Sequence, residues 1–212
     1  MIIYILRHGT TEWNRLGRLQ GIHNTPLNQA GRDLARETGK GMKDVHLDLV
    51  ISSPLDRAYE TAQIVCEGRD IPFIKDERLK EIDFGEWEGL ICAGENAQIT
   101  HEDIKRYNDL SDGNFKSQSG ESLNEVIARA EGFMQDLLSK KELEEKSILL
   151  STHGAFARAL THCYWQDNDF WHGCVPPNCS VSILTAKNGK LMDLEADHIY
   201  YAAAPENFYS LK

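Results

Sequence analysis

Two histidines and two arginines lie just behind three short apolar segments of the chain. Arg7 and His8 follow the first segment, Arg57 comes shortly after the second, and His153 and Gly154 follow the third. An arginine guanidinium is a rigid fork of N–H donors that matches the oxygens of a phosphate group. Neighbouring cations lower the pKa of a histidine, and a neutral imidazole is a nucleophile at neutral pH. These residue types predict a site that binds a phosphoryl group and attacks it.

Two other routes to phosphate chemistry find no support in the sequence. It contains neither a Gly-rich loop ending in Lys of the P-loop type nor an aspartate-rich cluster suited to a metal ion. We therefore expect side chains and helix dipoles, without a metal or a cofactor, to neutralise the charge that develops in the reaction. Five cysteines form no Cys-x-x-Cys pair, and we interpret them as reduced thiols. No role follows from the sequence of the loop Cys174–Cys179.

The three apolar segments predict strands of a parallel sheet. Residues 2–6, 47–51 and 148–150 are continuous apolar and β-branched runs, a pattern typical of strands buried on both faces. A polar turn and then apolar residues at helical spacing follow each run, so we expect helices on both sides of the sheet. Ligands bind such sheets beyond the carboxyl ends of the strands, near helix N-termini. The arginines and histidines should therefore meet in one crevice.

Several helices and their first residues can be predicted. Ser53 is a suitable N-cap and Pro54 a suitable first residue for the helix after the second strand. Asn28 is expected to cap another helix. The clearest amphipathic pattern spans residues 123–138, and a further helix is expected over 155–163.

The rest of the chain completes a single predicted domain. Asn188 and Gly189 indicate a tight hairpin, which would place an antiparallel pair at one edge of the sheet. Residues 90–120 are polar and are expected to form an insertion that covers the site. We predict one domain over residues 1–212, with a three-layer α/β/α fold, a mostly parallel central sheet and an antiparallel edge hairpin.

Composition limits the partners and the compartment. The chain has 212 residues, 23 Lys and Arg against 33 Asp and Glu, and a net charge of −10. This balance argues against nucleic acid and anionic membranes as partners, because both require a basic surface. Apolar runs are far shorter than the roughly 20 residues of a membrane-spanning helix. Met1 is followed directly by apolar residues without a basic leader, so we expect a cytoplasmic protein. The oligomeric state cannot be predicted.

Five sequence blocks resemble those of the histidine phosphatase superfamily, which has the phosphoglycerate-mutase-like fold. The resemblance runs from Ile2 to about Leu184. Arg-His-Gly alone would be weak evidence, but five blocks in the right order on the expected elements are specific. The blocks are LRHGTTEWN at 6–14 with QG at 20–21, SSPLDRA at 52–58 with TA at 61–62, LKEIDFGEWEG at 79–89, GES at 120–122 and THG at 152–154.

The resemblance implies a role for each matching residue. His8 would attack phosphorus and become phosphohistidine, while Arg7, Arg57 and His153 would hold the phosphoryl oxygens. Glu81 matches the family's proton donor to the leaving alkoxide, and it would then act as the base for the water that hydrolyses the phosphohistidine. The residues that would assist in binding the substrate are Asn14, Gln20, Gly21 and Gly154. Many relatives carry an acidic residue where this chain has Asn24.

Three functions compete for this chain. The favoured one is a phosphomonoester hydrolase, a histidine acid-type phosphatase acting on a small phosphorylated metabolite. The first alternative is a cofactor-dependent phosphoglycerate mutase, in which the phosphohistidine returns its group to a phosphoglycerate. The second alternative is a non-catalytic module that binds a phosphorylated ligand, which predicts loss of His8 or Glu81, although both are present.

The covering insertion favours the phosphatase over the mutase. Mutases of the family carry a longer insertion at this place, and they need a basic pocket for a second acid group. Here the insertion is short, and its cationic side chains are Lys105, Arg106 and Lys116. Sugar phosphates, phosphoserine, phosphoglycerates and a ribazole phosphate all remain open as substrates.

Overall fold

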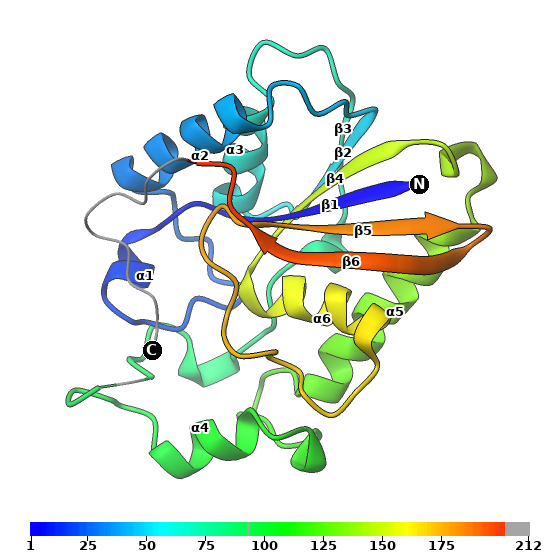
Figure 1. The fold of residues 1–212 in the computed structure, drawn as a ribbon. Coiled ribbons are helices and arrows are strands. Elements are labelled where there is room, and N and C mark those ends of the chain that lie inside the picture. The colour runs from blue at the N-terminus through cyan, green and yellow to red at the C-terminus, as the bar shows by residue number, and fades with distance from the viewer. Residues whose placement is uncertain (93, 202–212) are drawn as a thin grey trace.

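A six-stranded sheet forms the centre of the molecule (Figure 1), for which a computed structural model describes residues 1–92 and 94–201. Its strands are β1 (Ile2–Arg7), β2 (Leu49–Ser52), β3 (Phe73–Lys75), β4 (Ser147–Thr152), β5 (Val181–Lys187) and β6 (Lys190–His198). Their spatial order is β3-β2-β4-β1-β5-β6. The first four pair in parallel, whereas β5 pairs antiparallel with both β1 and β6. The predicted mostly parallel sheet with an antiparallel edge hairpin is confirmed.

Helices cover both faces of this sheet. They are α1 (Glu12–Arg15), α2 (Gln29–Gly41), α3 (Asp56–Val65), α4 (His101–Tyr107), α5 (Leu123–Ser139) and α6 (Gly154–Trp165), with short 3-10 helices at Glu77–Leu79, Gly85–Trp87, Leu110–Asp112 and Lys141–Leu143. Helices α2 and α3 pack together on one face, and α5 and α6 on the other (Figure 1). The predicted three-layer α/β/α fold is confirmed. No helix in the described part of the chain is long and apolar enough to span a membrane.

Strand β4 shows why the apolar runs predicted buried strands. Successive side chains of a strand point to opposite faces of the sheet. Ile148 and Leu150 belong to the core cluster that contains α5 and α6, whereas Leu149 belongs to the cluster beneath α2 and α3. All three are fully buried. Because both faces are covered, the strand carries no polar alternation, and its carboxyl end is held rigidly.

The predicted helices are present, and the predicted cap of α2 is confirmed. Asn28 caps α2 by accepting a hydrogen bond from the Gly31 amide at 2.8 Å. Ser122 and Glu125 form a reciprocal capping box at the start of α5. Each cap satisfies N–H groups that the first helical turn leaves without partners.

The predicted start of α3 is wrong. Neither Ser53 nor Pro54 is helical; the helix begins at Asp56, and its N-cap Leu55 offers no side-chain acceptor. The acceptor comes from a distant loop, because Asn24 Oδ1 accepts a hydrogen bond from the Asp56 amide at 2.8 Å. The Ser53 hydroxyl is used elsewhere, 2.8 Å from Nε2 of His153. Thus Asn24, from a distant loop, holds the start of the helix that carries Arg57.

Strand β3 was not predicted. It has three residues, lies at the edge of the sheet and pairs with only one neighbour, β2. Its central residue, Ile74, is 51% exposed. Strand β3 is too short to contain the continuous apolar run from which the other strands were predicted.

The insertion at residues 90–120 lies at the end of the molecule drawn lowest in Figure 1. It contains α4, whose Tyr107 is buried against Trp87 with ring centroids 5.5 Å apart. It also reaches the loop after α6, where Trp171 Nε1 donates to Asn108 Oδ1 at 3.1 Å. The single-domain assignment over residues 1–212 stays a prediction, and its last part, 202–212, lies outside the described residues, as does Ala93 within the insertion.

Two glycines test how tightly the first loop packs on α2. A Cβ on Gly31 would come within 2.2 Å of the Thr10 carbonyl oxygen, whereas a Cβ on the exposed Gly132 of α5 would meet nothing within 4 Å. We expect Gly31→Ala to destabilise the protein by about 2 kcal/mol or more, because backbone must move. Gly132→Ala should stabilise it by about 0.5–1 kcal/mol through helix propensity. Urea unfolding of both variants measures the difference, and equal effects would contradict the packing argument.

Candidate active site

Three parallel strands deliver the predicted side chains to one crevice. Arg7 ends β1, and its register partner in β4 is Thr152, so the residues that follow, His8 and His153, emerge at the same level. Their ring centroids are 5.2 Å apart. Arg57 enters from the first turn of α3 and is fully buried. The structure thus brings together the arginines and histidines that the sequence placed after separate strands.

One hydrogen bond determines the tautomer of His8. Its Nδ1 lies 2.6 Å from the Gly9 carbonyl oxygen, which can only accept a hydrogen bond. The proton therefore sits on Nδ1, and Nε2 keeps its lone pair. The carbonyl of His8 accepts in turn from Asn178 Nδ2 at 2.9 Å. Both the ring and the backbone of His8 are held in place.

Burial lowers the pKa of His8 well below its ordinary value. Loss of hydration is the largest cause, and the nearby Arg57 and Arg7 add to it. The pKa of His153 is lowered in the same way, by burial first and then by Arg57 and His8. The predicted direction is correct for His8, but the predicted cause, cations alone, is incomplete. Both imidazoles are therefore neutral at neutral pH.

Backbone carbonyls hold the guanidinium of Arg57. Its two terminal nitrogens donate to the carbonyls of Gly21 at 2.6 Å and of His23 at 2.7 Å. The carboxylate of Glu88 holds that loop by accepting from the amides of Ile22 at 2.8 Å and His23 at 3.0 Å. Burial lowers the pKa of Arg57 to about 10, so it stays charged at neutral pH.

Three buried polar atoms around the crevice have no hydrogen-bond partner within the described residues. They are Nε of Arg7, Nε of Arg57 and Nδ1 of His153. A buried polar group without a partner costs roughly 1–3 kcal/mol, and folded proteins seldom leave several together. A phosphoryl group offers several acceptor oxygens at once, and it is an anion beside two guanidinium groups. This set of atoms therefore fits a bound phosphoryl group.

Glu81 lies at the start of α6, beside the phosphoryl crevice. Its carboxylate accepts hydrogen bonds from the amides of Phe156 at 2.9 Å, Ile82 at 3.0 Å and Ala155 at 3.2 Å. A Cβ on Gly154 would come within 2.8 Å of Val175 and 3.4 Å of Nε of Arg7. Glycine therefore lets the helix start close to Arg7, with Glu81 fixed over its first turn.

Arg129 holds the backbone of Glu81 from α5. Its guanidinium donates to the carbonyls of Arg78 at 2.7 Å, Lys80 at 2.9 Å and Glu81 at 3.2 Å, and it pairs with Glu121 at 2.7 Å. Arg129 could not be identified from the sequence, because nothing in a helical pattern marks a side chain that reaches into a distant turn. Glu121 belongs to the GES block at 120–122, but the sequence assigned it no role.

The loop Cys174–Cys179, to which the sequence assigned no role, supports Arg7 and His8. The Arg7 guanidinium donates to the carbonyl of Pro176, and the Cys179 amide donates to the carbonyl of Arg7 at 3.1 Å. Asn178 of the same loop holds His8, as described above. The buried Arg158 fixes the start of the loop by donating to the Cys174 carbonyl at 2.8 and 3.0 Å. All five cysteines are free thiols.

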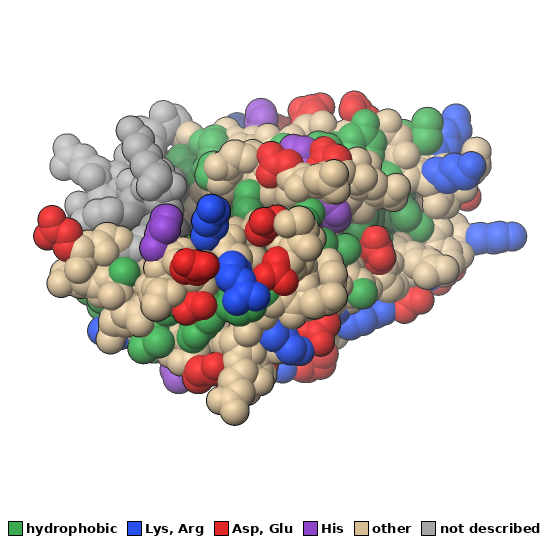
Figure 2. Space-filling model, turned by 90° about the horizontal axis from the view of Figure 1, so that it is seen from below, with side chains coloured by type: hydrophobic (Ala, Val, Ile, Leu, Met, Phe, Trp, Pro, Cys, Tyr) green, Lys and Arg blue, Asp and Glu red, His purple; other side chains and the backbone are tan. Residues whose placement is uncertain are grey.

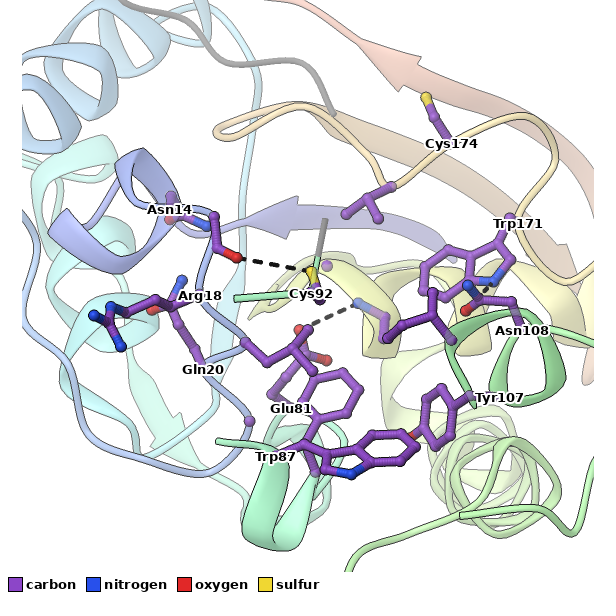
Figure 3. A pocket seen from close by; sticks show the side chains of 18 of the residues that line it. Asn14, Arg18, Gln20, Glu81, Trp87, Cys92, Tyr107, Asn108, Trp171 and Cys174 are labelled. Carbon is purple, nitrogen blue, oxygen red and sulfur yellow. Dashed lines mark hydrogen bonds between the residues drawn. The ribbon is translucent and has the colours of Figure 1, made fainter. Parts of the chain in front are cut away.

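The predicted substrate-binding residues line one cavity of about 430 Å³. Gln20 is anchored through Oε1, which accepts from Thr11 at 3.0 Å and Thr25 at 2.5 Å. Asn14 Oδ1 accepts from the Thr11 amide at 3.1 Å. In Figure 3, Asn14 and Gln20 lie on the opposite side of the cavity from Trp171. The described residues contain no group of three His, Cys, Asp or Glu side chains that could hold a metal ion.

The surface of the molecule does not carry the excess of positive charge that Arg7 and Arg57 give to the crevice. On the face seen in Figure 2, acidic and basic side chains are interspersed, with apolar surface between them. The positive charges of Arg7 and Arg57 are therefore local and buried rather than part of a broad basic surface.

Comparison with known proteins places this chain in a family. The model of the histidine phosphatase superfamily (branch 1) matches residues 3–195. Phosphoserine phosphatase 1 of Hydrogenobacter thermophilus is 32% identical over 186 residues, covering 86% of this chain and 85% of that protein. A probable phosphoglycerate mutase, GpmB of Proteus mirabilis, is 33% identical over 152 residues, covering 72% and 69%. The structure of YhfR from Bacillus stearothermophilus superposes with a TM-score of 0.74 at 30% identity, covering 99% and 98%.

The lowered pKa of His8 predicts a change in stability with pH. The folded protein keeps the ring neutral, whereas the unfolded chain protonates it below about pH 6.5, so stability falls as the pH decreases through that value. The His8→Asn variant should lose this contribution and show a shallower slope below pH 6.5, by up to about 1.4 kcal/mol per pH unit. Urea unfolding between pH 5 and 8 measures both slopes. Parallel curves below pH 6.5 would contradict the prediction.

Proposed function

Because the chain belongs to the histidine phosphatase superfamily (branch 1), we propose that it hydrolyses the phosphomonoester of a small metabolite through a phosphohistidine on His8. One observation carries the proposal. The neutral ring of His8, with its lone pair on Nε2, lies within electrostatic reach of Arg7 and Arg57, whose Nε atoms are buried without partners in the described residues. Glu81, whose carboxylate is fixed by the Phe156 amide, lines the same cavity as His8. Nucleophile, anion cradle and acid are the components that this reaction requires.

In the first step the lone pair of His8 Nε2 attacks phosphorus. The new N–P bond forms as the P–O bond to the alcohol breaks, and protonated Glu81 gives its proton to the departing oxygen. Arg7, Arg57 and His153 hold the remaining phosphoryl oxygens, and their fixed positions stabilise the charge that develops there.

In the second step a water molecule takes the place of the alcohol. The Glu81 carboxylate accepts a proton from this water as its oxygen attacks phosphorus. The N–P bond breaks, the electron pair returns to Nε2 of His8, and inorganic phosphate leaves. Glu81 ends the cycle protonated, as it began. Neither step requires a metal ion. A histidine nucleophile and a carboxylic acid as proton donor make the proposed enzyme a histidine acid-type phosphatase.

The covering segment favours hydrolysis over mutase activity. None of the three cations in its described residues lines the cavity. Arg106 pairs with Asp112 at 2.9 Å, Lys116 pairs with Glu125 at 2.7 Å, and Lys105 is exposed. Among the described residues of this segment, those that line the cavity are Cys92, Ile104, Tyr107 and Asn108. All four side chains are uncharged at neutral pH. A mutase must also hold the acid group of a phosphoglycerate, and this segment supplies no cation for it.

We further propose a cytoplasmic enzyme with a small-molecule substrate and no nucleic-acid or membrane partner. The net charge of −10 supports this proposal, since a nucleic-acid polymer requires an extended basic surface. The size of the cavity also supports it, because about 430 Å³ is typical of a site for a small ligand.

The two roles of Glu81 predict which intermediate its variant accumulates. With p-nitrophenyl phosphate, whose leaving group needs no proton, Glu81→Gln should still form phosphohistidine but hydrolyse it about 100-fold more slowly or worse. The intermediate, trapped at alkaline pH and located by mass spectrometry, should lie on His8.

His8→Ala should show neither intermediate nor turnover, and EDTA should leave the wild-type rate unchanged. A Glu81→Gln protein with wild-type turnover would contradict the assignment.

Phosphatase and mutase are separated by the fate of the phosphoryl group. With 3-phosphoglycerate and 2,3-bisphosphoglycerate present, we expect that any turnover releases inorganic phosphate faster than it forms 2-phosphoglycerate. The reason is that the described residues of the covering segment bring no cation to the cavity that could hold the product acid for a second transfer. Phosphate assay and phosphorus NMR of one reaction measure both products. Isomerisation that outpaces phosphate release would establish the mutase instead.

A further inference from the structure

Beyond the phosphoryl crevice, the wall of the cavity is largely aromatic and aliphatic. Three separate segments contribute to it: the turn after Glu81, helix α4 of the covering insertion, and the loop that follows α6. The apolar side chains that they bring to the cavity are Phe84, Trp87, Ile104, Tyr107, Trp171 and Val175. This end of the cavity is where the alcohol part of a phosphomonoester must lie when its phosphorus faces His8.

The polar atoms of two of these rings are already engaged. The Tyr107 hydroxyl donates to the carbonyl of Glu121 at 2.9 Å, and Trp171 Nε1 donates to Asn108 Oδ1 at 3.1 Å. Neither side chain therefore has an O–H or N–H group left to donate to a ligand, and both present the apolar surface of their rings. Tyr107 also packs edge to face on Trp87, which fixes the two rings relative to each other. Figure 3 shows Trp87 and Tyr107 together on one side, and Trp171 beside Asn108.

Few charged groups in the described lining are left for a second anionic group. The lining contains Arg7 and Glu81, which serve the phosphoryl crevice, and Arg18. The Arg18 guanidinium donates to the carbonyl of Gly89, so part of its hydrogen-bonding capacity holds the base of the covering segment. A carboxylate among these rings would lose its hydration, and burial of a charge without a partner is costly.

We propose that the alcohol part of the substrate is uncharged and carries an apolar ring or chain, which packs against Trp87, Tyr107 and Trp171. This inference rests on the proposed hydrolysis at His8 and narrows it to one class of phosphomonoester. Burial of an aromatic ring removes a large apolar area from water. A carboxylate at the same place would gain no such contact and would meet one partly engaged cation.

The test uses three phosphate esters of primary alcohols, which differ at the far end of the alcohol. They are n-propyl phosphate, 3-phenylpropyl phosphate and 2-carboxyethyl phosphate. Since each leaves as a primary alkoxide, differences in kcat/KM report chiefly on the far end of the cavity. We expect 3-phenylpropyl phosphate to exceed n-propyl phosphate by at least about tenfold. We expect 2-carboxyethyl phosphate to fall below both.

Two tryptophan variants locate the effect. Trp171→Ala removes one ring of the wall and should reduce the preference for the phenyl group by about tenfold. Trp165→Ala is the matched control, because its ring stacks on His172 at 3.5 Å and does not line the cavity. It should retain the wild-type preference. Thermal unfolding of both proteins with and without orthovanadate shows that each folds and binds a phosphate analogue.

Failure of this inference can be told apart from failure of the proposed function. In His8→Ala, which should not turn over, stabilisation against heat by the three esters measures binding alone. If 2-carboxyethyl phosphate binds or reacts as well as 3-phenylpropyl phosphate, the inference is wrong. If the order of binding holds but no ester is hydrolysed by the wild-type enzyme, the proposed function is wrong and the binding inference stands.

Discussion

Burial of two positive charges that form no ion pair with a carboxylate among the described residues is the constraint on which this structure depends. Arg7 and Arg57 lose their hydration beside the two histidines, and their pKa values fall to about 10. Backbone carbonyls replace part of that hydration, from Pro176 for Arg7 and from Gly21 and His23 for Arg57. A carboxylate in the same place would compete with a phosphoryl group for the arginines. Carbonyls hold the cations in position and leave their positive charge available to an anion.

This choice of partners explains why loops far from the strands matter. Glu88 helps to position the carbonyls that hold Arg57, because it binds the amides of Ile22 and His23 in the same loop. The loop Cys174–Cys179 does the same for Arg7, and it is fixed in turn by the buried Arg158. A net charge of −10 over the whole chain has little influence here, because surface charges are screened over about 8–10 Å of saline. Local geometry sets the potential of the crevice.

The sequence predicted those parts of the site that depend on local patterns. Apolar runs located β1, β2 and β4, and the residues just after them gave His8 and His153. Parts that depend on contacts between distant segments were not predictable. Nothing near Ser53 shows that its hydroxyl faces His153 while Asn24 caps α3 instead. Likewise, the sequence shows Arg129 only as a polar residue of an amphipathic helix. Its contact with the turn at Glu81 is visible only in the folded structure.

The same division separates chemistry from specificity. The end of the cavity proposed to bind the phosphoryl group is built at the carboxyl ends of parallel strands, where helices cover both faces of the sheet. The alcohol end is built from α4 and from the loop that carries Trp171, joined through one hydrogen bond to Asn108. These segments contribute no strand to the sheet, so side chains such as Trp171 can differ while the strand ends that carry Arg7, His8 and His153 stay the same. A fold of this kind can therefore keep one reaction while its substrate changes, and the identity of the substrate has to be sought in the covering segments.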